Sequence, residues 1–478
     1  MYLNEYFKEA PNVLIEQLSC DSRLPMKNCI FFCMTGVKYD GHDYIEEAIE
    51  NGASVIIHTK DTDTSLKAIF IKVKDINLTL AGIARLFYNN SLKDLNVHIT
   101  CGCYGKSCVS SYINQLINDD EKTSSIGAYG IQYKDKNLTY PGSTLTLFDN
   151  FKYLSNISIE GCSSCCLEVD ALSLSYNKLE GLRPSTFIYT NTSKFSKDYR
   201  GFSHKYFDSI RKYLYTLEEE TKIILNRDDV SYNELISACS NNIVSYGFSK
   251  KATYVISNPY YYIDHTTFDL TVDNKTYNIY SPLITVQNIY NLTASIACLI
   301  ENGYSFEFVL NNLSLLKAPE GIYENVYSDN KNVIVDYCYS LDSYAFIQDY
   351  VTSLDNYGKA YAVISCNADD DFAHLNAIYS NIKDVFDLVI FTEDMSYEKD
   401  IHDILANAAK IAKGNNFLTI EDREEAIKTA IDLMNNRDIL FILGKGNGKF
   451  FYKNYQKILY EGDKEIALNY IGNTQQNI

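Results

Sequence analysis

The sequence predicts an α/β protein with more than one domain. The clearest indication is the last third of the chain, where apolar strand-like runs alternate with helical segments, as in a mostly parallel sheet covered on both faces. A second indication is a glycine turn between a predicted strand and a predicted helix near residue 102. The length of 478 residues is a third, because it exceeds what one hydrophobic core usually organises. We therefore expect two to four domains.

The first segment, residues 1–92, is predicted to combine short strands with a helix. The runs Cys29–Cys33 and Ser54–His58 are apolar enough for strands. Between them, Tyr44–Asn51 is predicted to be a helix that ends at Gly52. Two polar clusters flank these elements: Asp21, Ser22 and Arg23, and then Asp40, Gly41 and His42.

The second segment, residues 93–315, opens with the glycine turn. Its strand is predicted at Asn96–Ile99, its helix covers residues 108–117, and the turn carries Gly102, Gly105, Lys106 and Ser107. A strand, a glycine turn and a helix N-terminus direct backbone N–H groups toward an anion. Lys106 would neutralise phosphates, and the Ser107 hydroxyl suits Mg²⁺. We interpret the turn as a phosphate-binding loop, although Thr100 replaces its usual first glycine; a glycine turn without a ligand is the alternative.

Further elements are predicted along the rest of the chain. The second segment contains a hairpin at 268–280 that turns at Asp273-Asn274. Apolar runs predict the following strands: 165–169, 186–190 and 222–225 in the second segment, and 332–337, 360–366, 388–392 and 439–444 in the third, residues 316–478. Helices are predicted at 397–412 and 421–434, between strands of the third segment.

Composition narrows the functional classes. A net charge of −18 leaves no basic face for a nucleic-acid partner. No apolar run is long enough to insert in a membrane, and the N-terminus lacks a secretory signal, so we expect a cytoplasmic protein. Thirteen scattered cysteines, an odd number, predict reduced thiols. Those near Cys103 and Cys165 fit no usual metal-site spacing, and zinc or iron–sulfur binding is the weaker alternative.

The order of these motifs resembles the Mur ligases, and within them the UDP-N-acetylmuramoyl-tripeptide synthetase branch. The resemblance runs from about Ser19 to Gly446 and rests on the two polar clusters, the phosphate loop and the following motifs: Glu168, Thr190–Lys194, Asn226–Asp229, Asp336–Tyr337 and Gly444–Gly446. It implies three domains: a UDP-binding α/β domain, a central P-loop ATPase domain and a Rossmann-like C-terminal domain. It also implies an enzyme that uses ATP and Mg²⁺ to add an amino acid to a UDP-N-acetylmuramoyl-peptide through an acyl phosphate, in peptidoglycan precursor synthesis. The oligomeric state stays open, with a monomer as the default expectation.

The resemblance implies roles for the matching residues. Lys106, Glu168 and Asp336 would be catalytic: Lys106 would clamp the phosphates, Ser107 and Glu168 would share Mg²⁺, and Asp336 would reach the nucleotide. Gly102, Gly105, Asn288 and Asn291 would complete the ATP site, with both asparagines preceding the adenine-contacting helix. The substrate-binding residues would be Ser22, Arg23, Asp40 and His42 for the uridine diphosphate, and Ser143 and Thr144 for the muramoyl-peptide.

The chain departs from the family pattern at several positions that carry chemistry. Family histidines are replaced by Leu172 and Tyr339, and an arginine by Ile322. The lysine that the family carbamylates to bind a second Mg²⁺ falls at Arg211, with Lys212 one residue away. The motif that selects the amino acid appears as residues 393–396. Two hypotheses therefore stay open: a divergent ligase, and a pseudoenzyme that binds nucleotide or UDP-sugar and acts through partners.

Overall fold

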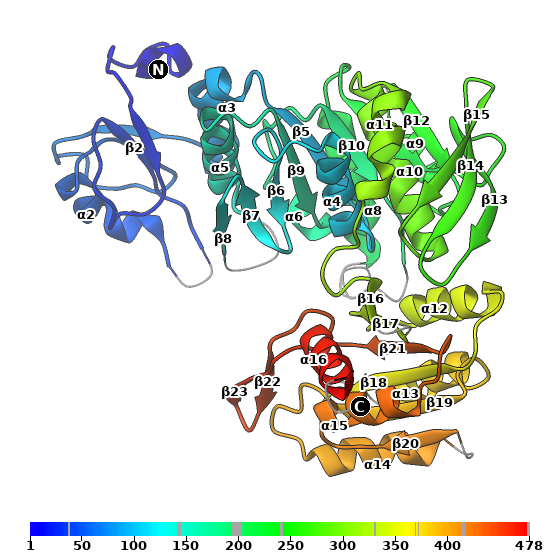
Figure 1. Ribbon diagram of the computed structural model, residues 1–478. Helices are drawn as coiled ribbons and strands as arrows, with labels where there is room; N and C mark the ends of the chain where they lie inside the picture. The colour runs from blue at the N-terminus through cyan, green and yellow to red at the C-terminus, as the bar shows by residue number, and fades with distance from the viewer. Residues whose placement is uncertain are drawn as a thin grey trace.

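The computed structural model describes residues 1–36, 39–140, 145–193, 203–239, 242–328, 331–368, 370, 372–412 and 416–475. Along the chain it forms a four-stranded, an eleven-stranded and a six-stranded sheet, each with its own helices (Figure 1). This arrangement confirms the predicted α/β class and the three-part architecture. We refer to the parts as the first, central and third units.

The first unit is a parallel sheet of β1 (Gln17–Ser19), β2 (Cys29–Phe32), β3 (Ala53–His58) and β4 (Ile69–Lys72). Its helices are α1 (Leu3–Tyr6), η1 (Gly41–Tyr44) and α2 (Ile45–Glu50), and Gly52 follows α2 with a φ of 106°. The long helix α3 (Ile76–Leu92) then packs against α5 (Leu147–Ile159) of the central unit. Buried side chains of both units therefore form one continuous core.

The central unit is built around β5 (Asn96–Cys101), which lies between β9 (Ser164–Val169) and β10 (Thr186–Tyr189) and is parallel to both. The carboxyl ends of these strands meet at one edge, where α4 (Lys106–Ile117) begins. The sheet is completed by β6 (Ser124–Gly127), β7 (Gly130–Tyr133), β8 (Lys136–Leu138), β11 (Lys222–Asn226), β12 (Ile243–Gly247), β13 (Tyr254–Tyr261), β14 (Thr266–Val272) and β15 (Lys275–Ser281). Its further helices are α6 (Ala171–Ser175), α8 (Ser203–Thr216), α9 (Tyr232–Ile236), α10 (Val286–Glu301), α11 (Phe306–Asn312) and η2 (Leu313–Leu315).

The predicted hairpin is present as β14 and β15. Asp273 and Asn274 form its turn with φ of 48° and 61°, the left-handed conformations that such turns require. Helix α10 packs against α4 and against strands of the central sheet, and it is almost entirely buried.

The third unit has the strand order β16-β17-β21-β18-β19-β20, with β16 antiparallel and the others parallel. Its strands are β16 (Glu324–Ser328), β17 (Lys331–Asp336), β18 (Ala360–Cys366), β19 (Leu388–Glu393), β20 (Phe417–Thr419) and β21 (Ile439–Leu443). Its helices are α12 (Leu341–Ser353), α13 (Phe372–Ile382), α14 (Ile401–Ile411), α15 (Arg423–Leu433) and α16 (Asp463–Gln475). A separate hairpin comprises β22 (Phe450–Lys453) and β23 (Gln456–Leu459). Two cores, one on each face, cover this sheet as predicted.

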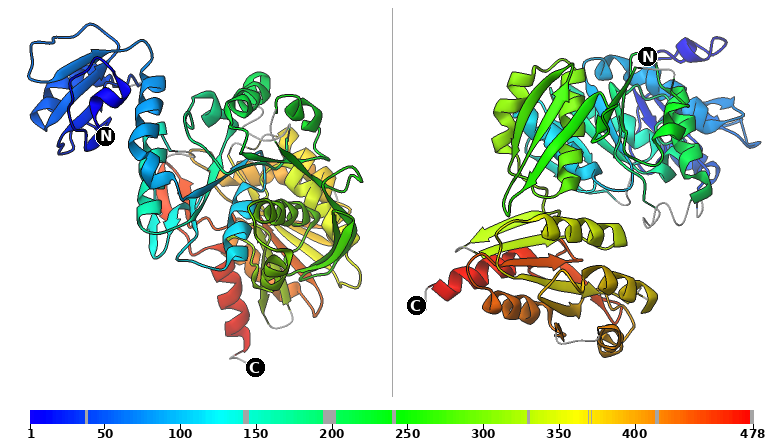
Figure 2. Two further views of the ribbon diagram at one scale, coloured as in Figure 1. Left: turned by 90° about the horizontal axis from the view of Figure 1, so that it is seen from above. Right: turned by 90° about the vertical axis from the view of Figure 1, so that its right-hand side faces the viewer.

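The third unit stacks against the edge of the central unit at which β5, β9 and β10 end, and the first unit projects to one side (Figures 1 and 2). All thirteen cysteines are free thiols, in agreement with the sequence prediction. Within the described ranges, no three His, Cys, Asp or Glu side chains are grouped to hold a metal ion. The described part of the chain also has no helix with the length and apolar character to cross a membrane.

Candidate active site

A cavity of about 370 Å³ lies between the central and third units. Its walls include Lys106, Ser107 and Glu168 from the central sheet edge, Asn291 from α10 and Asp336 from the end of β17. These residues are distant in sequence, and all of them were predicted to bind nucleotide or metal. The fold therefore brings most of the predicted nucleotide site together at one place.

The glycine turn is held in a conformation that other residues rarely adopt. Gly102 and Gly105 have φ of +131° and +84°. A Cβ atom at Gly102 would lie 2.2 Å from Thr190 Oγ1, and one at Gly105 would lie 2.2 Å from Asn291 Oδ1. Lys106 Nζ donates a hydrogen bond to the Gly102 carbonyl at 2.8 Å, so its ammonium lies across the turn. The turn thus presents a cation and a helix N-terminus to the cavity, the combination that binds phosphates.

Ser107 and Glu168 form the oxygen-rich wall beside this turn. Ser107 Oγ donates to Glu168 Oε2 at 2.8 Å. Burial raises the pKa of Glu168, an effect that Ser107 and the Lys106 charge partly offset. Gly127 makes room for the carboxylate, because a Cβ there would lie 2.2 Å from Glu168 Oε1. A buried carboxylate paired with a hydroxyl is a donor set that fits Mg²⁺.

Asp336, at the end of β17, also lines the cavity and is bound by backbone groups. Its carboxylate accepts N–H bonds from Tyr323 at 2.8 Å and from Cys338 at 2.7 Å. Burial raises its pKa to about 7. Asp336 therefore fixes the chain at the entry to the third unit while it faces the cavity.

The two asparagines do not precede a helix as predicted: both lie within α10. The helix begins earlier because Thr285 caps it, accepting a hydrogen bond from the Asn288 N–H at 3.4 Å. Asn291 faces the cavity, whereas Asn288 accepts a bond from Tyr112 Oη at 2.9 Å and is buried. Asn288 thus supports the site from behind.

The predicted uridine-diphosphate residues lie in the first unit, and none of them lines the cavity. Arg23 is exposed and pairs with Asp21 at 2.8 Å, and the buried Ser22 donates to Glu47. His42 Nδ1 lies 2.6 Å from Asp40 Oδ1, while its Nε2 accepts the Thr59 N–H at 3.1 Å. The His42 and Asp40 side chains therefore bond to each other and, through His42, to the Thr59 backbone within the first unit.

Ser143 and Thr144, predicted to bind the muramoyl-peptide, lie outside the described residues. Of the positions that depart from the family pattern, Ile322 and Tyr339 line the cavity and Leu172 is partly exposed on α6.

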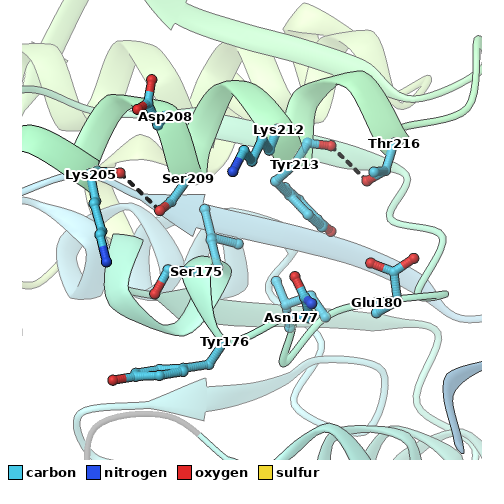
Figure 3. Close-up of a pocket in the computed structure, with 12 residues that line it drawn as sticks. Ser175, Tyr176, Asn177, Glu180, Lys205, Asp208, Ser209, Lys212, Tyr213 and Thr216 are labelled. Carbon is cyan, nitrogen blue, oxygen red and sulfur yellow. Dashed lines mark hydrogen bonds between the residues drawn. The ribbon is translucent and has the colours of Figure 1, made fainter. Parts of the chain in front are cut away.

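Arg211 and Lys212, on α8, lie away from the cavity. Arg211 forms ion pairs with Asp208 and, at 3.2 Å, with Glu234. Lys212 instead lines a second cavity of about 520 Å³ between α6 and α8, together with Lys205 and Tyr213 (Figure 3). The described part of this helix thus places no lysine beside Glu168.

Several aromatic side chains of the active-site cavity were missed in the sequence. They are Tyr129, Tyr323 and Phe346; Tyr104 and Tyr337 also line the cavity, but both stand inside motifs identified in the sequence. The three missed residues come from different elements of two units, so no local pattern in the sequence identifies them.

Three protein-family models match the chain in succession. The model described as "Mur ligase family, catalytic domain" matches residues 14–88, "Mur ligase middle domain" matches 99–299, and "Mur ligase, glutamate ligase domain" matches 323–446. Each match falls on one of the three units.

Similar proteins extend over nearly the whole chain. A UDP-N-acetylmuramyl-tripeptide synthetase 2 of Oceanobacillus iheyensis is 27% identical, with 98% of this chain and 96% of the relative covered. A UDP-N-acetylmuramoyl-L-alanyl-D-glutamate–2,6-diaminopimelate ligase of Halalkalibacterium halodurans is 28% identical, with 91% and 90% covered. A solved structure of a ligase with that same description superimposes with a TM-score of 0.77 at 20% identity, covering 99% of both chains. A MurF ligase from Thermotoga maritima, solved in complex with ADP, gives a TM-score of 0.62 at 17% identity, with 98% of this chain and all of that chain covered (100%).

Proposed function

Because this chain belongs to the Mur ligase family, we propose that it uses ATP and Mg²⁺ to join an amino acid to a UDP-N-acetylmuramoyl-peptide in peptidoglycan precursor synthesis. The observation that carries the proposal is the meeting of Lys106, Ser107 and Glu168 with Asp336 across one cavity. The relatives named above support the substrate class. The ADP complex of the Thermotoga MurF ligase supports the nucleotide. We further propose that the protein acts as a monomer.

The reaction consists of two displacements. The substrate carboxylate attacks the γ-phosphorus of ATP, ADP leaves, and an acyl phosphate forms. The amino group of the incoming amino acid then attacks the acyl carbon, and phosphate leaves with the bonding electron pair as the amide forms and the amine loses a proton. Phosphoryl transfer depends mainly on in-line positioning and charge neutralisation. Mg²⁺, held by Ser107 and Glu168, would supply part of that neutralisation.

The remaining charge neutralisation and the positioning of ATP would come from the chain's own residues. Lys106 is the sole cation among the described residues that line the cavity, so the protein's charge compensation for the phosphates rests on it. The N-terminal N–H groups of α4 add donors in fixed positions. Asn291 and Asp336 also line the cavity. We therefore assign binding and orientation of ATP to this cavity.

The test is product formation. The protein is incubated with Mg·ATP, UDP-N-acetylmuramoyl-L-alanyl-D-glutamate and pooled amino acids; phosphate release is followed and the product is weighed by mass spectrometry. We expect a product heavier by one amino acid residue, and its absence with Lys106→Ala. Folded protein that gives neither product nor substrate-dependent phosphate release would refute ligation of this substrate. Nucleotide or UDP-sugar binding by such protein would favour the pseudoenzyme instead.

A further inference from the structure

Tyr104 lies within the glycine turn, and its backbone is held on both sides. Its N–H donates to Asn191 Oδ1 at 3.0 Å. Its carbonyl accepts from Thr190 Oγ1 at 2.6 Å and from Asn191 Nδ2 at 3.0 Å. The position of the Tyr104 ring is therefore tied to the conformation of the phosphate-binding turn.

The Tyr104 side chain leads from this turn to the third unit. Its hydroxyl donates to Ser193 Oγ at 3.4 Å, and Ser193 Oγ in turn donates to the Asp342 carboxylate. Ser193 is buried, and its N–H contacts Cys103 Sγ at 3.2 Å. Asp342 lies in the first turn of α12, where its negative charge suits the helix N-terminus. Tyr104 and Ser193 thus connect the phosphate-binding turn to α12.

Both ends of this connection also border the active-site cavity. Tyr104 lines one wall, and Ser343 and Phe346 of α12 line another. A nucleotide in the cavity would therefore contact the turn and the helix that Tyr104 and Ser193 join. Any coupling of nucleotide binding to α12 through this contact would be reciprocal.

We propose that Tyr104 is a positioning residue that couples nucleotide occupancy of the glycine turn to the docking of α12. The inference rests on the proposed nucleotide-binding function and adds to it a specific coupling residue. Nucleotide binding would order the turn, fix the Tyr104 hydroxyl and strengthen its contact through Ser193 with Asp342. Docking of α12 would in turn favour the nucleotide-binding conformation of the turn.

The chain contains a matched control contact. Tyr260, on β13, donates from its hydroxyl to Asp355 Oδ2 at 2.9 Å. Asp355 follows the C-terminal end of α12, and neither residue lines the active-site cavity. Both tyrosines therefore bridge the central and third units through a hydroxyl, but only Tyr104 belongs to the phosphate-binding turn.

The experiment measures hydrogen–deuterium exchange of the 341–353 amides in the full-length protein, with and without Mg·AMP-PNP. Wild type is compared with Tyr104→Phe, Ser193→Ala and Tyr260→Phe. Without nucleotide, we expect Tyr104→Phe and Ser193→Ala to speed exchange about fivefold, as for the loss of one hydrogen bond. Nucleotide should slow exchange in wild type and in Tyr260→Phe, and should have little effect in the other two variants.

Equilibrium dialysis with the same nucleotide separates the two ways of failing. No binding to folded wild type would refute nucleotide binding itself; the comparison without nucleotide would then still test whether Tyr104 docks α12. Normal binding with an equal exchange response in wild type and Tyr104→Phe would overturn the coupling. Ser193→Ala keeps the test available if Tyr104→Phe does not fold. Unchanged exchange in both variants without nucleotide would also overturn the proposal.

Discussion

At the scale of single residues, Glu168 is proposed to bind Mg²⁺, although burying its charge destabilises the fold. Its carboxylate is buried, and burial raises its pKa, so the ionised form is unfavourable to the fold. Glu168→Gln keeps the shape and removes the charge. We expect the ligation rate to fall on the order of a hundredfold, while the thermal midpoint at pH 8 stays equal or rises. Rate assays and thermal unfolding of the same preparation measure both, and a fully active variant would contradict the metal assignment.

His98 lies outside the active-site cavity, and it should make the free energy of unfolding depend on pH. It is buried in β5 with Nδ1 3.3 Å from Thr186 Oγ1, and burial lowers its pKa to about 4. Between pH 6.5 and 4 the unfolded chain binds a proton that the folded chain excludes, so the free energy of unfolding falls as the pH falls. We expect wild type to lose up to about 1.4 kcal/mol per pH unit in this window relative to His98→Gln. Urea unfolding at several pH values measures the difference, and parallel curves would contradict it.

Site residues that are neighbours in the sequence could be predicted together, whereas site residues from distant parts of the chain could not. Lys106 and Ser107 belong to one short motif, so their joint position could be predicted. Tyr129 and Phe346 reach the same cavity from different units, and only tertiary structure brings them together. The prediction for the first-unit residues Ser22 and His42 remains untested by the geometry of the cavity, because they lie in a separate unit.

At the scale of elements, buried strands were predicted best. The strand predicted at 360–366 is β18 with the same limits, because a parallel strand covered on both faces is a continuous apolar run. Strands β6, β7 and β8 were not predicted, because their short sequences are not uniformly apolar, although β6 and β7 are largely buried. Asn288 and Asn291 were placed before a helix on the family resemblance alone, whereas both lie within α10, a helix that is buried on nearly all sides.

The junction of β6 and β9 yields a prediction for an element. Gly127 ends β6, which pairs with β9, and a Cβ at Gly127 would lie 2.2 Å from Glu168 Oε1. Because the sheet holds this backbone in place, we expect Gly127→Ala to displace the carboxylate and lower the ligation rate about tenfold or more. Gly472→Ala is the matched control, since nothing lies within 4 Å of a Cβ there. Steady-state assays of both variants measure the effect, and equal rates would show that the carboxylate adapts.

At the scale of the whole molecule, the order of motifs was enough to predict three units, but not how their cores are joined. The first unit shares a core with one face of the central sheet through α3, and the other face of the central sheet has a core of its own with α4 and α10. The third unit has cores on both faces of its own sheet, one of which also includes Ile284 of the central unit. The packing of α3 on α5 depends on side chains far apart in the sequence, such as Ile83 and Phe151, both buried in the shared core. Motif order alone could not reveal that contact.

This distribution of cores predicts how the molecule unfolds. We expect calorimetry to resolve one transition for the first and central units and another for the third unit, because, among the described residues, the buried residues of both third-unit cores come from the third unit itself apart from Ile284. Mg·AMP-PNP should raise both midpoints, because residues of the central and third units line the same cavity. A free nucleotide concentration of a hundred times Kd should raise the free energy of unfolding by about 2.7 kcal/mol. Lys106→Ala should abolish the shift, and a nucleotide effect on one transition alone would show that the ligand does not bridge the two units.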